Sequence, residues 1–236
     1  MITLTPRLSA VAGYVPCCRC VADIGTDHAY VPLYLLQTGR AKQAIASDIH
    51  EGPARRAEEH CRKERVGEAV SVRIGPGLAA VRPGEADGAV IAGMGGLMIR
   101  SILEDGGETA AQMEWFVLQP QNHAADLRLW LADHGYAICG ETLAAEERQL
   151  YQILFVRHGT MTPLGALEAE TGILDFRKRD PLFPDFLRSL IRRREWTIQG
   201  VAEDTSNETN RMKRRRAEKE KKELEALLWK FESKTL

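Results

Sequence analysis

The stretch Val21-Ala-Asp-Ile-Gly-Thr-Asp-His-Ala-Tyr-Val31 decides the fold of this chain of 236 residues. Its pattern predicts an apolar strand that runs into Asp23, a turn at Gly25, and then a helix. In open parallel sheets a ligand binds beyond the carboxyl ends of the strands, close to the first turn between a strand and a helix. We therefore predict a small-molecule site at this turn.

The charges in the turn predict a cationic ligand. Asp23, Asp27 and His28 occupy a loop in which a dinucleotide-binding fold would place further glycines against a pyrophosphate. Carboxylates repel phosphate groups and attract cations. Because S-adenosylmethionine carries an ammonium and a sulfonium but no phosphate, we expect it, rather than NAD, as the cofactor.

Apolar runs and helical patterns alternate from Val21 to Val156, which is typical of a parallel sheet with helices on both faces. The expected strands are Val21 to Ile24, Ala44 to Asp48, Val70 to Ile74, Gly88 to Ala92, Trp115 to Leu118, Tyr136 to Leu143 and Tyr151 to Val156. The last two leave no room for a helix between them, so we expect an antiparallel pair at the sheet edge. A mostly parallel seven-stranded sheet of this kind is the class I, Rossmann-like methyltransferase arrangement. A short helix containing Leu4, Leu8 and Val11 is expected to pack on this domain.

The composition changes after Gly159. Residues 160–236 contain no Cys and no His, and they hold 17 Lys and Arg against 14 Asp and Glu, whereas residues 1–159 hold 15 against 19. We expect a cofactor-binding sheet domain over residues 1–159 and a basic, coiled-coil-like helical domain over residues 160–236. One short helix from about Leu164 to Arg177 should precede an antiparallel hairpin. Two apolar stripes at helical spacing predict that hairpin: Leu187, Leu190, Ile191, Ile198 and Val201, and then Ala217, Leu224, Leu227, Leu228 and Phe231.

The overall composition, with 44% hydrophobic residues and a net charge of −1, is that of a globular protein. No apolar run approaches the roughly 18 residues that span a bilayer, and the first residues lack the features of a signal peptide, so we expect a cytoplasmic protein without a membrane partner. The five cysteines lack the paired spacing of a zinc site, and we expect reduced thiols and no metal. The sequence leaves the oligomeric state open and slightly favours a monomer.

Two further turns follow predicted strands on the same edge. Asp48 ends the second strand about 23 residues after Gly25, where an acid can bind both hydroxyls of a cofactor ribose or can cap the next helix. Gly75-Pro-Gly-Leu78 follows the third strand. It would lie beside the adenine with its backbone accessible, although a simple turn explains it equally well.

The fourth strand ends in Ala92-Gly-Met-Gly-Gly96, where three glycines leave room for a flat substrate. Backbone carbonyls and the Met94 thioether could hold such a substrate, and a tight turn is the alternative. Gln119-Pro-Gln-Asn-His123 follows the fifth strand toward the same rim. A single histidine such as His123 is more often a surface residue than a catalyst.

Two basic clusters, Arg192-Arg-Arg194 and Arg211-Met-Lys-Arg-Arg-Arg216, fall on the predicted hairpin. Helices often carry solvated charge, and acidic residues lie nearby. The repetition of one sign within each cluster nevertheless favours binding to the phosphates of a nucleic acid.

These motifs resemble, in order and spacing, the bacterial tRNA adenine-N1 methyltransferases of the TrmK type. The matching stretches are Asp23-Ile-Gly-Thr-Asp-His-Ala-Tyr-Val-Pro32, Ala46-Ser-Asp48 with Gly52-Pro53, Arg73-Ile-Gly-Pro-Gly-Leu78, Ala92-Gly-Met-Gly-Gly96, Leu118-Gln-Pro120, Leu127-Arg-x-Trp-Leu131 and Tyr151-x-Ile. They cover nearly all of residues 4–157, whereas the tail resembles the family only in architecture. Pro76 stands where the family usually has Asp, so adenine binding here should lean on backbone groups.

The resemblance implies methyl transfer from S-adenosylmethionine to N1 of adenine 22 in tRNA. The implied cofactor residues are Asp23, Gly25, Thr26 and Asp27 near the methionine part, Asp48 at the ribose, Gly77 and Leu78 at the adenine, and Gly93. The implied catalytic residues are Asp27 and His28, closest to the transferring methyl, and Gly93, Met94 and Gly95 at the target base. Two alternatives stay open: a class I methyltransferase acting on a protein or a small molecule, and a nucleotide-binding adaptor whose helices recruit partners.

Overall fold

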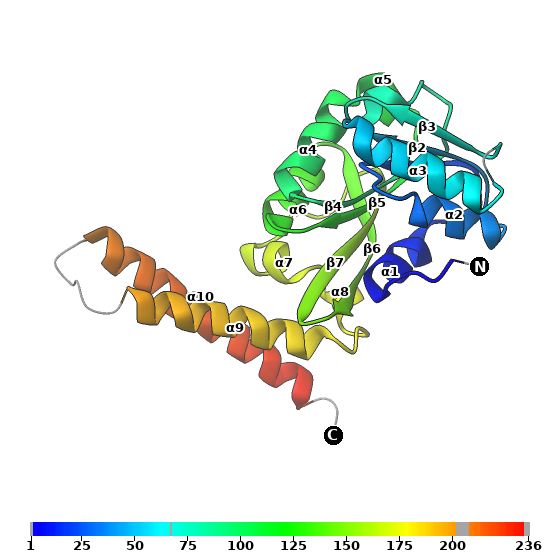
Figure 1. The fold of residues 1–236 in the computed structure, drawn as a ribbon. Coiled ribbons are helices and arrows are strands. Elements are labelled where there is room, and N and C mark those ends of the chain that lie inside the picture. The colour runs from blue at the N-terminus through cyan, green and yellow to red at the C-terminus, as the bar shows by residue number, and fades with distance from the viewer. Residues whose placement is uncertain (1, 67, 202–207, 234–236) are drawn as a thin grey trace. The chain divides into compact units, whose positions relative to one another are not determined.

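The computed structural model describes residues 2–66, 68–201 and 208–233. It divides into two units, Met1–Leu164 and Gly165–Leu236, and each is described by itself (Figure 1).

The first unit contains one seven-stranded sheet with the order β3-β2-β1-β4-β5-β7-β6. The strands are β1 (Cys18–Ile24), β2 (Ala41–Asp48), β3 (Val70–Ile74), β4 (Gly88–Met94), β5 (Trp115–Pro120), β6 (Tyr136–Glu146) and β7 (Gln149–His158). Strands β1 to β5 pair in parallel, and β7 runs antiparallel to both β5 and β6. The predicted class I methyltransferase sheet is therefore confirmed, including its antiparallel edge. Most strands are longer than predicted, since their polar ends carry no apolar signal.

The helices of the first unit cover both faces of the sheet (Figure 1). They are α1 (Pro6–Tyr14), α2 (Tyr30–Gln37), α3 (Glu51–Lys63), the 3₁₀ helix η1 (Gly77–Ala80), α4 (Gly96–Asp105), α5 (Gly107–Ala111) and α6 (Ala124–Asp133). The chain moves outward from β1 through β2 to β3 and then returns to β4 and β5 on the other side of β1. Because crossovers between parallel strands are right-handed, this reversal puts α2 and α3 on one face and α4 on the other. It also creates a switch point beside β1.

The core explains why these segments form strands. In β1, four consecutive residues from Val21 to Ile24 are buried, so both faces of the strand are covered. The edge hairpin is anchored by a buried ion pair, in which the Arg128 Nε donates to Glu141 Oε1 at 2.6 Å and both side chains have no exposed surface. Arg128 also donates to Gln152 at 2.7 Å, which ties α6 to β6 and β7.

The second unit is helical, with α7 (Ala166–Thr171), α8 (Leu174–Arg177), α9 (Phe183–Gly200) and α10 (Glu208–Glu232). The prediction of one helix from Leu164 to Arg177 is wrong, because the chain breaks at Gly172, whose φ of 94° is incompatible with a helix. Helices α9 and α10 run antiparallel, since Phe183 stacks edge-on with Phe231 while Arg194 pairs with Glu220. The connection between them, residues 202–207, lies outside the described residues, and coiled-coil packing stays a prediction. In the described part of the chain, no helix combines the length and apolarity that crossing a membrane requires.

Candidate active site at the carboxyl ends of the strands

A cavity of about 390 Å³ opens at the carboxyl ends of β1 and β4, beside the switch point of the sheet. It is lined by Thr5, Arg7, Leu8, Asp23, Gly25, Thr26, Asp27, His28, Ala29, Tyr30, Val31, Ala92 and Gly93. The cavity thus brings together six predicted site residues from two separate motifs: Asp23, Gly25, Thr26, Asp27, His28 and Gly93. Asp48, Gly77, Leu78, Met94 and Gly95 are not part of its lining.

The turn after β1 is held by hydrogen bonds to the neighbouring strand. The backbone N–H groups of Gly25 and Thr26 both donate to the Ser47 carbonyl, at 2.7 and 2.9 Å. The Thr26 hydroxyl accepts from the N–H of Ala29 at 3.0 Å, and Ala29 adopts a left-handed φ of 55° at the start of α2. These N–H groups are therefore committed to the fold, and the cavity wall here offers side chains rather than free amides.

Asp23 is a buried acid without a cationic partner among the described residues. Its exposed fraction is 8%, and burial raises its pKa from 3.8 to about 6, against a smaller lowering by a hydrogen bond with Thr26. An ionised carboxylate in this environment is costly unless a cation neutralises it. The end of β1 is therefore suited to bind a positively charged group.

Asp27 is engaged by a residue that the sequence did not point to. Its Oδ1 accepts from Arg56 on α3, with the Arg56 Nε at 2.9 Å, and its Oδ2 lies 3.4 Å from His28 Nε2. Because Arg56 already neutralises much of its charge, Asp27 is a weaker ligand for an ammonium than Asp23. The partners lie 29 positions apart, and no local pattern announces the pair.

His28 belongs to an aromatic cluster at the rim. Its ring centroid lies 5.4 Å from that of Tyr30, which in turn lies 5.0 Å from the His60 ring. The His28 carbonyl is 2.7 Å from His60 Nδ1, a distance at which that nitrogen donates. These contacts fix the loop between β1 and α2 against α3.

Asp48 lies at the end of β2, as predicted, and its side chain closes a turn just before the following helix. Its Oδ1 accepts from the backbone N–H of His50 at 2.7 Å, immediately before α3. The carboxylate is thereby oriented at the edge of the sheet. Ile49, the next residue, leaves 59% of its surface exposed, an unusual exposure for an isoleucine that the sequence pattern does not reveal.

Gly77 and Leu78, the two residues predicted to contact the adenine, pack against the protein core instead. Leu78 is 2% exposed, and its Cδ1 lies beside Gly106. Gly77 has a φ of 50°, and a Cβ there would lie 3.2 Å from Ile102, so α4 packs against this turn. The Leu78 side chain therefore faces inward, and Ile74, four positions earlier, is the large hydrophobic side chain that is exposed here, at 59%.

The glycine loop after β4 is held by the loop after β5. The Gly93 N–H donates to the side-chain oxygen of Gln119 at 3.1 Å, and Arg7 Nη1 donates to the same oxygen at 2.8 Å. Gln119 has no exposed surface, so this junction is buried. Next along the loop, the Gly96 N–H donates to the Asn122 carbonyl at 3.0 Å. Arg7 was missed by sequence reasoning, which treated its helix as packing alone.

Met94 connects the two predicted loops. A Cβ on Gly25 would collide with the terminal methyl of Met94, so this side chain lies directly over the turn after β1. Its thioether is thus turned toward Gly25 rather than toward an open base pocket, and the interpretation of Met94 as a ligand for the base loses support. Gly95 stays close to the rim, where a Cβ would lie 3.0 Å from Asn122 Oδ1. His123 pairs with Asp126 at 2.8 Å and starts α6, in line with a surface residue.

Exposed apolar side chains gather around this edge of the sheet. They are Tyr30, Ile49, Ile74, Leu97 and Met98, each more than 40% exposed. Clusters of exposed apolar residues mark binding surfaces. The sequence pattern does not reveal these exposures, because the same apolar residues are equally compatible with a buried position.

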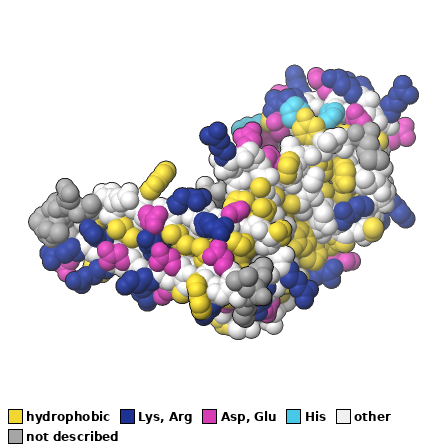
Figure 2. Space-filling view, turned by 90° about the horizontal axis from the view of Figure 1, so that it is seen from below, with side chains coloured by type: hydrophobic (Ala, Val, Ile, Leu, Met, Phe, Trp, Pro, Cys, Tyr) yellow, Lys and Arg dark blue, Asp and Glu magenta, His cyan; other side chains and the backbone are white. Residues whose placement is uncertain are grey.

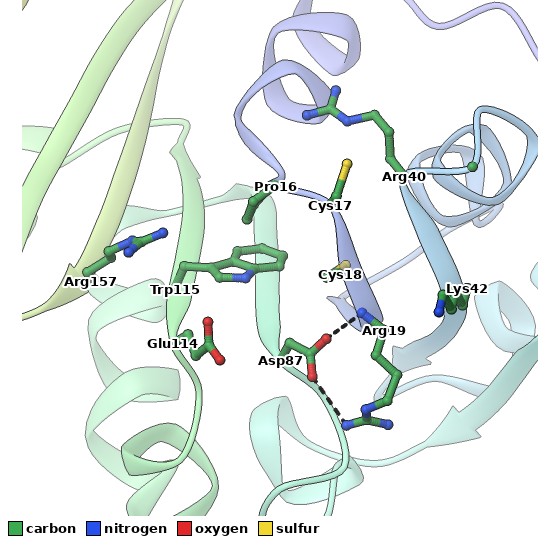
Figure 3. A pocket seen from close by; sticks show the side chains of 11 residues that line it. Pro16, Cys17, Cys18, Arg19, Arg40, Lys42, Asp87, Glu114, Trp115 and Arg157 are labelled. Carbon is green, nitrogen blue, oxygen red and sulfur yellow. Dashed lines mark hydrogen bonds and ion pairs between the residues drawn. The ribbon is translucent and has the colours of Figure 1, made fainter.

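A second cavity, of about 570 Å³, lies at the opposite ends of the strands, and Figure 3 shows its lining. Its cations are largely tied to the protein: Arg19 binds Asp87 at 3.2 Å, and Arg40 donates to the carbonyls of Gly13 and Val15. It contains none of the predicted site residues. Among the described residues, no group of His, Cys, Asp and Glu is arranged to hold a metal ion.

Comparison with known proteins identifies the same fold. Residues 4–154 match the family model described as a methyltransferase domain. A tRNA (adenine(22)-N(1))-methyltransferase from Bacillus subtilis is 40% identical over 158 residues, which are 67% of this chain and 66%, just under two thirds, of that protein. The crystal structure of the B. subtilis M1A22 tRNA methyltransferase TrmK aligns with a TM-score of 0.87 and 30% identity, over 97% of this chain and 100% of that one. Streptococcus pneumoniae Sp1610, crystallised with S-adenosyl-L-methionine, aligns with a TM-score of 0.84 and 31% identity, over 96% of this chain and 100% of that one.

Proposed function

Because the chain belongs to the TrmK family of tRNA (adenine(22)-N(1))-methyltransferases, we propose that it transfers a methyl group from S-adenosylmethionine to N1 of an adenine in tRNA. The observation that carries this proposal is Asp23. It is a buried carboxylate with a pKa of about 6, and no cation lies within ion-pair distance in the described chain. It faces a cavity at the switch point of a methyltransferase sheet.

The residues of the cavity fit S-adenosylmethionine. When bound, this cofactor supplies an activated methyl group on a sulfonium. Asp23 binds the methionine ammonium, and Gly93 leaves space beside it, whereas the space over Gly25 is taken by the Met94 side chain. Asp48, already oriented by the His50 N–H, accepts from the ribose hydroxyls. Backbone groups at Gly77 and the exposed Ile49 and Ile74 line the adenine, which compensates for Pro76 in place of an acid.

Methyl transfer to adenine N1 needs alignment more than proton transfer. The N1 lone pair is free at neutral pH, so no base has to expose it, and placing the two reactants in line supplies much of the rate. The product ring is cationic. Asp27 at the cavity wall, together with the carbonyls of Gly93 and Gly95, stabilises the positive charge that develops on the base.

The target adenine has to leave its pairing partner, because N1 lies on the pairing edge. The exposed Leu97 and Met98 follow the glycine loop directly and offer an apolar surface for an extruded base. His28 and Tyr30 close the opposite side of the rim.

We assign tRNA binding to the second unit. Several of its basic residues have acidic partners, such as Arg194 with Glu220 and Arg214 with Glu218. In the described part of the chain no carboxylate lies within ion-pair distance of the exposed residues Arg192, Arg193, Arg211, Lys213 and Arg215. These cations are available for phosphate contacts. A monomer acting on cytoplasmic tRNA is the state that we propose.

Two measurements test this function. Titration calorimetry should detect binding of S-adenosylmethionine and none of NAD. Labelled methyl groups should then be transferred to unmodified tRNA and not to a protein fraction. Transfer to protein only would favour a class I methyltransferase with another substrate, and cofactor binding without any transfer would favour a nucleotide-binding adaptor.

A further inference from the structure

We propose that Trp196, together with Arg192 and Arg193, forms a stacking site for an unpaired RNA base on the outer face of α9. The inference rests on the proposed function, because it takes tRNA as the partner of the second unit. Trp196 is 76% exposed, the highest exposure among the large hydrophobic side chains of the described residues. Helix α9 buries Leu187 and Leu190 on its other side. The exposed indole of Trp196 therefore contributes nothing to the core of the hairpin.

The neighbours of Trp196 on the helix surface carry positive charge only. Residues three and four positions apart lie on the same face of a helix. Arg193 and Arg192 occupy these positions before Trp196, and Gln199 and Gly200 occupy them after it. Both arginines are exposed. The face therefore combines a flat aromatic group with two cations and contains no acid.

The acid nearest to Trp196 in sequence, Glu195, has a partner on the other helix: it accepts from Lys221 at 2.9 Å. Its neighbour Arg194 likewise pairs with Glu220 at 2.7 Å. These contacts hold α9 against α10. In the described chain, Arg192 and Arg193 lie beyond ion-pair distance of any carboxylate, and Glu195, three positions after Arg192, pairs with Lys221 instead.

A second exposed tryptophan in the same hairpin provides the contrast. Trp229 on α10 is 68% exposed, but Glu225 and Glu232 stand four positions before and three positions after it. Glu225 pairs with Lys221 at 3.4 Å and Glu232 pairs with Arg188, so the face around Trp229 carries both signs of charge and no excess of positive charge. Figure 2 shows hydrophobic side chains standing out from the hairpin among both signs of charge, so exposure alone does not distinguish the two positions.

This chemistry fits a single-stranded nucleotide. Bases stack on aromatic side chains in a sequence-tolerant way, and adjacent guanidinium groups bind the phosphates or extend the stack. A base inside a helical stem presents no free face. The ligand is therefore an unpaired nucleotide of the tRNA, such as one in a loop, and not the stem.

The test compares Trp196→Ala with the matched control Trp229→Ala in the full chain, using unmodified tRNA in a binding titration at several salt concentrations. Trp196→Ala should weaken binding about five- to a hundredfold at every salt concentration, the range observed when one stacked base loses its aromatic partner. Its salt dependence should be unchanged, and Trp196→Phe should restore most of the affinity. Trp229→Ala should stay within about twofold of the parent chain. Replacing Arg192 and Arg193 by Ala should instead flatten the slope of log affinity against log salt by about 0.7 to 0.9 for each lost contact.

The outcomes separate this site from the proposed function. Equal affinities for Trp196→Ala and Trp229→Ala would overturn the stacking site, while a flattened slope for the arginine variant would leave tRNA binding by the hairpin intact. Altered sedimentation of Trp196→Ala with unchanged tRNA affinity would assign the face to a protein contact and would also overturn it. Circular dichroism and cofactor titration serve as controls that each variant is folded.

Discussion

The substitution Asp23→Asn is predicted to stabilise the free protein and to weaken cofactor binding at the same time. Burial raises the pKa of Asp23 from 3.8 to about 6, so at neutral pH the folded chain holds an ionised carboxylate that would be more stable in water. A difference of about two pH units between the folded and unfolded states corresponds to about 3 kcal/mol. An uncharged amide of the same shape removes that penalty.

The pH dependence of this effect has a definite sign. Because the folded-state pKa lies above the unfolded value, the folded protein holds more protons between about pH 4 and pH 6. The contribution of Asp23 to the free energy of unfolding is therefore most favourable at low pH and falls as the pH rises through this window. The advantage of Asp23→Asn should grow by about 2 kcal/mol between pH 4.5 and pH 7.5.

Denaturant unfolding followed by tryptophan fluorescence measures this directly. Asp105→Asn, at an exposed position at the end of α4, is the matched control and should change stability by no more than about 0.5 kcal/mol at either pH. Calorimetry should show weaker binding of S-adenosylmethionine to Asp23→Asn. If the variant is no more stable than the parent at pH 7.5, or if its advantage is the same at both pH values, Asp23 is not the strained acid described here.

Three further predictions concern the site and the units. Asp48→Ala should weaken S-adenosylmethionine binding at least tenfold in calorimetry, because charge-assisted bonds contribute about 1.5 to 3 kcal/mol each; an unchanged affinity would remove Asp48 from the site. Gly95→Val should block methylation of tRNA while sparing cofactor affinity, because its side chain meets Asn122 at the rim; a normal rate at saturating cofactor would contradict a substrate role for this loop. A chain ending at Leu164 should keep cofactor binding and lose most tRNA affinity in a filter assay, and full tRNA affinity would refute the division of labour between the units.

Sequence patterns predicted the sheet well because its strands are buried on both faces. Residues such as Val21, Ala22 and Ile24 are apolar because their strand is covered on both faces, so the pattern is visible in the sequence. The helix break at Gly172 was missed, since one glycine within a helical pattern is compatible with either state. Its left-handed φ depends on packing that only the folded unit contains.

The site was predicted in part, and the misses share a cause. Motif spacing brought Asp23, Gly25 and Gly93 to one cavity because parallel strands end at one edge. Hydrogen-bond and ion-pair partners from distant elements could not be predicted from the sequence, as with Arg56 at Asp27 or Arg7 at Gln119. The exposed fraction of the apolar side chains around the site could not be predicted from the sequence either.

The most direct test of the central claim is where the methyl group arrives. The full chain should be incubated with S-adenosylmethionine and unmodified tRNA, and the product examined by nucleoside mass spectrometry and by primer extension. We predict 1-methyladenosine at a single adenine, where primer extension stops because N1 is needed for base pairing. Methylation at another atom of adenine, or no methylated nucleoside although the cofactor binds, would contradict the account.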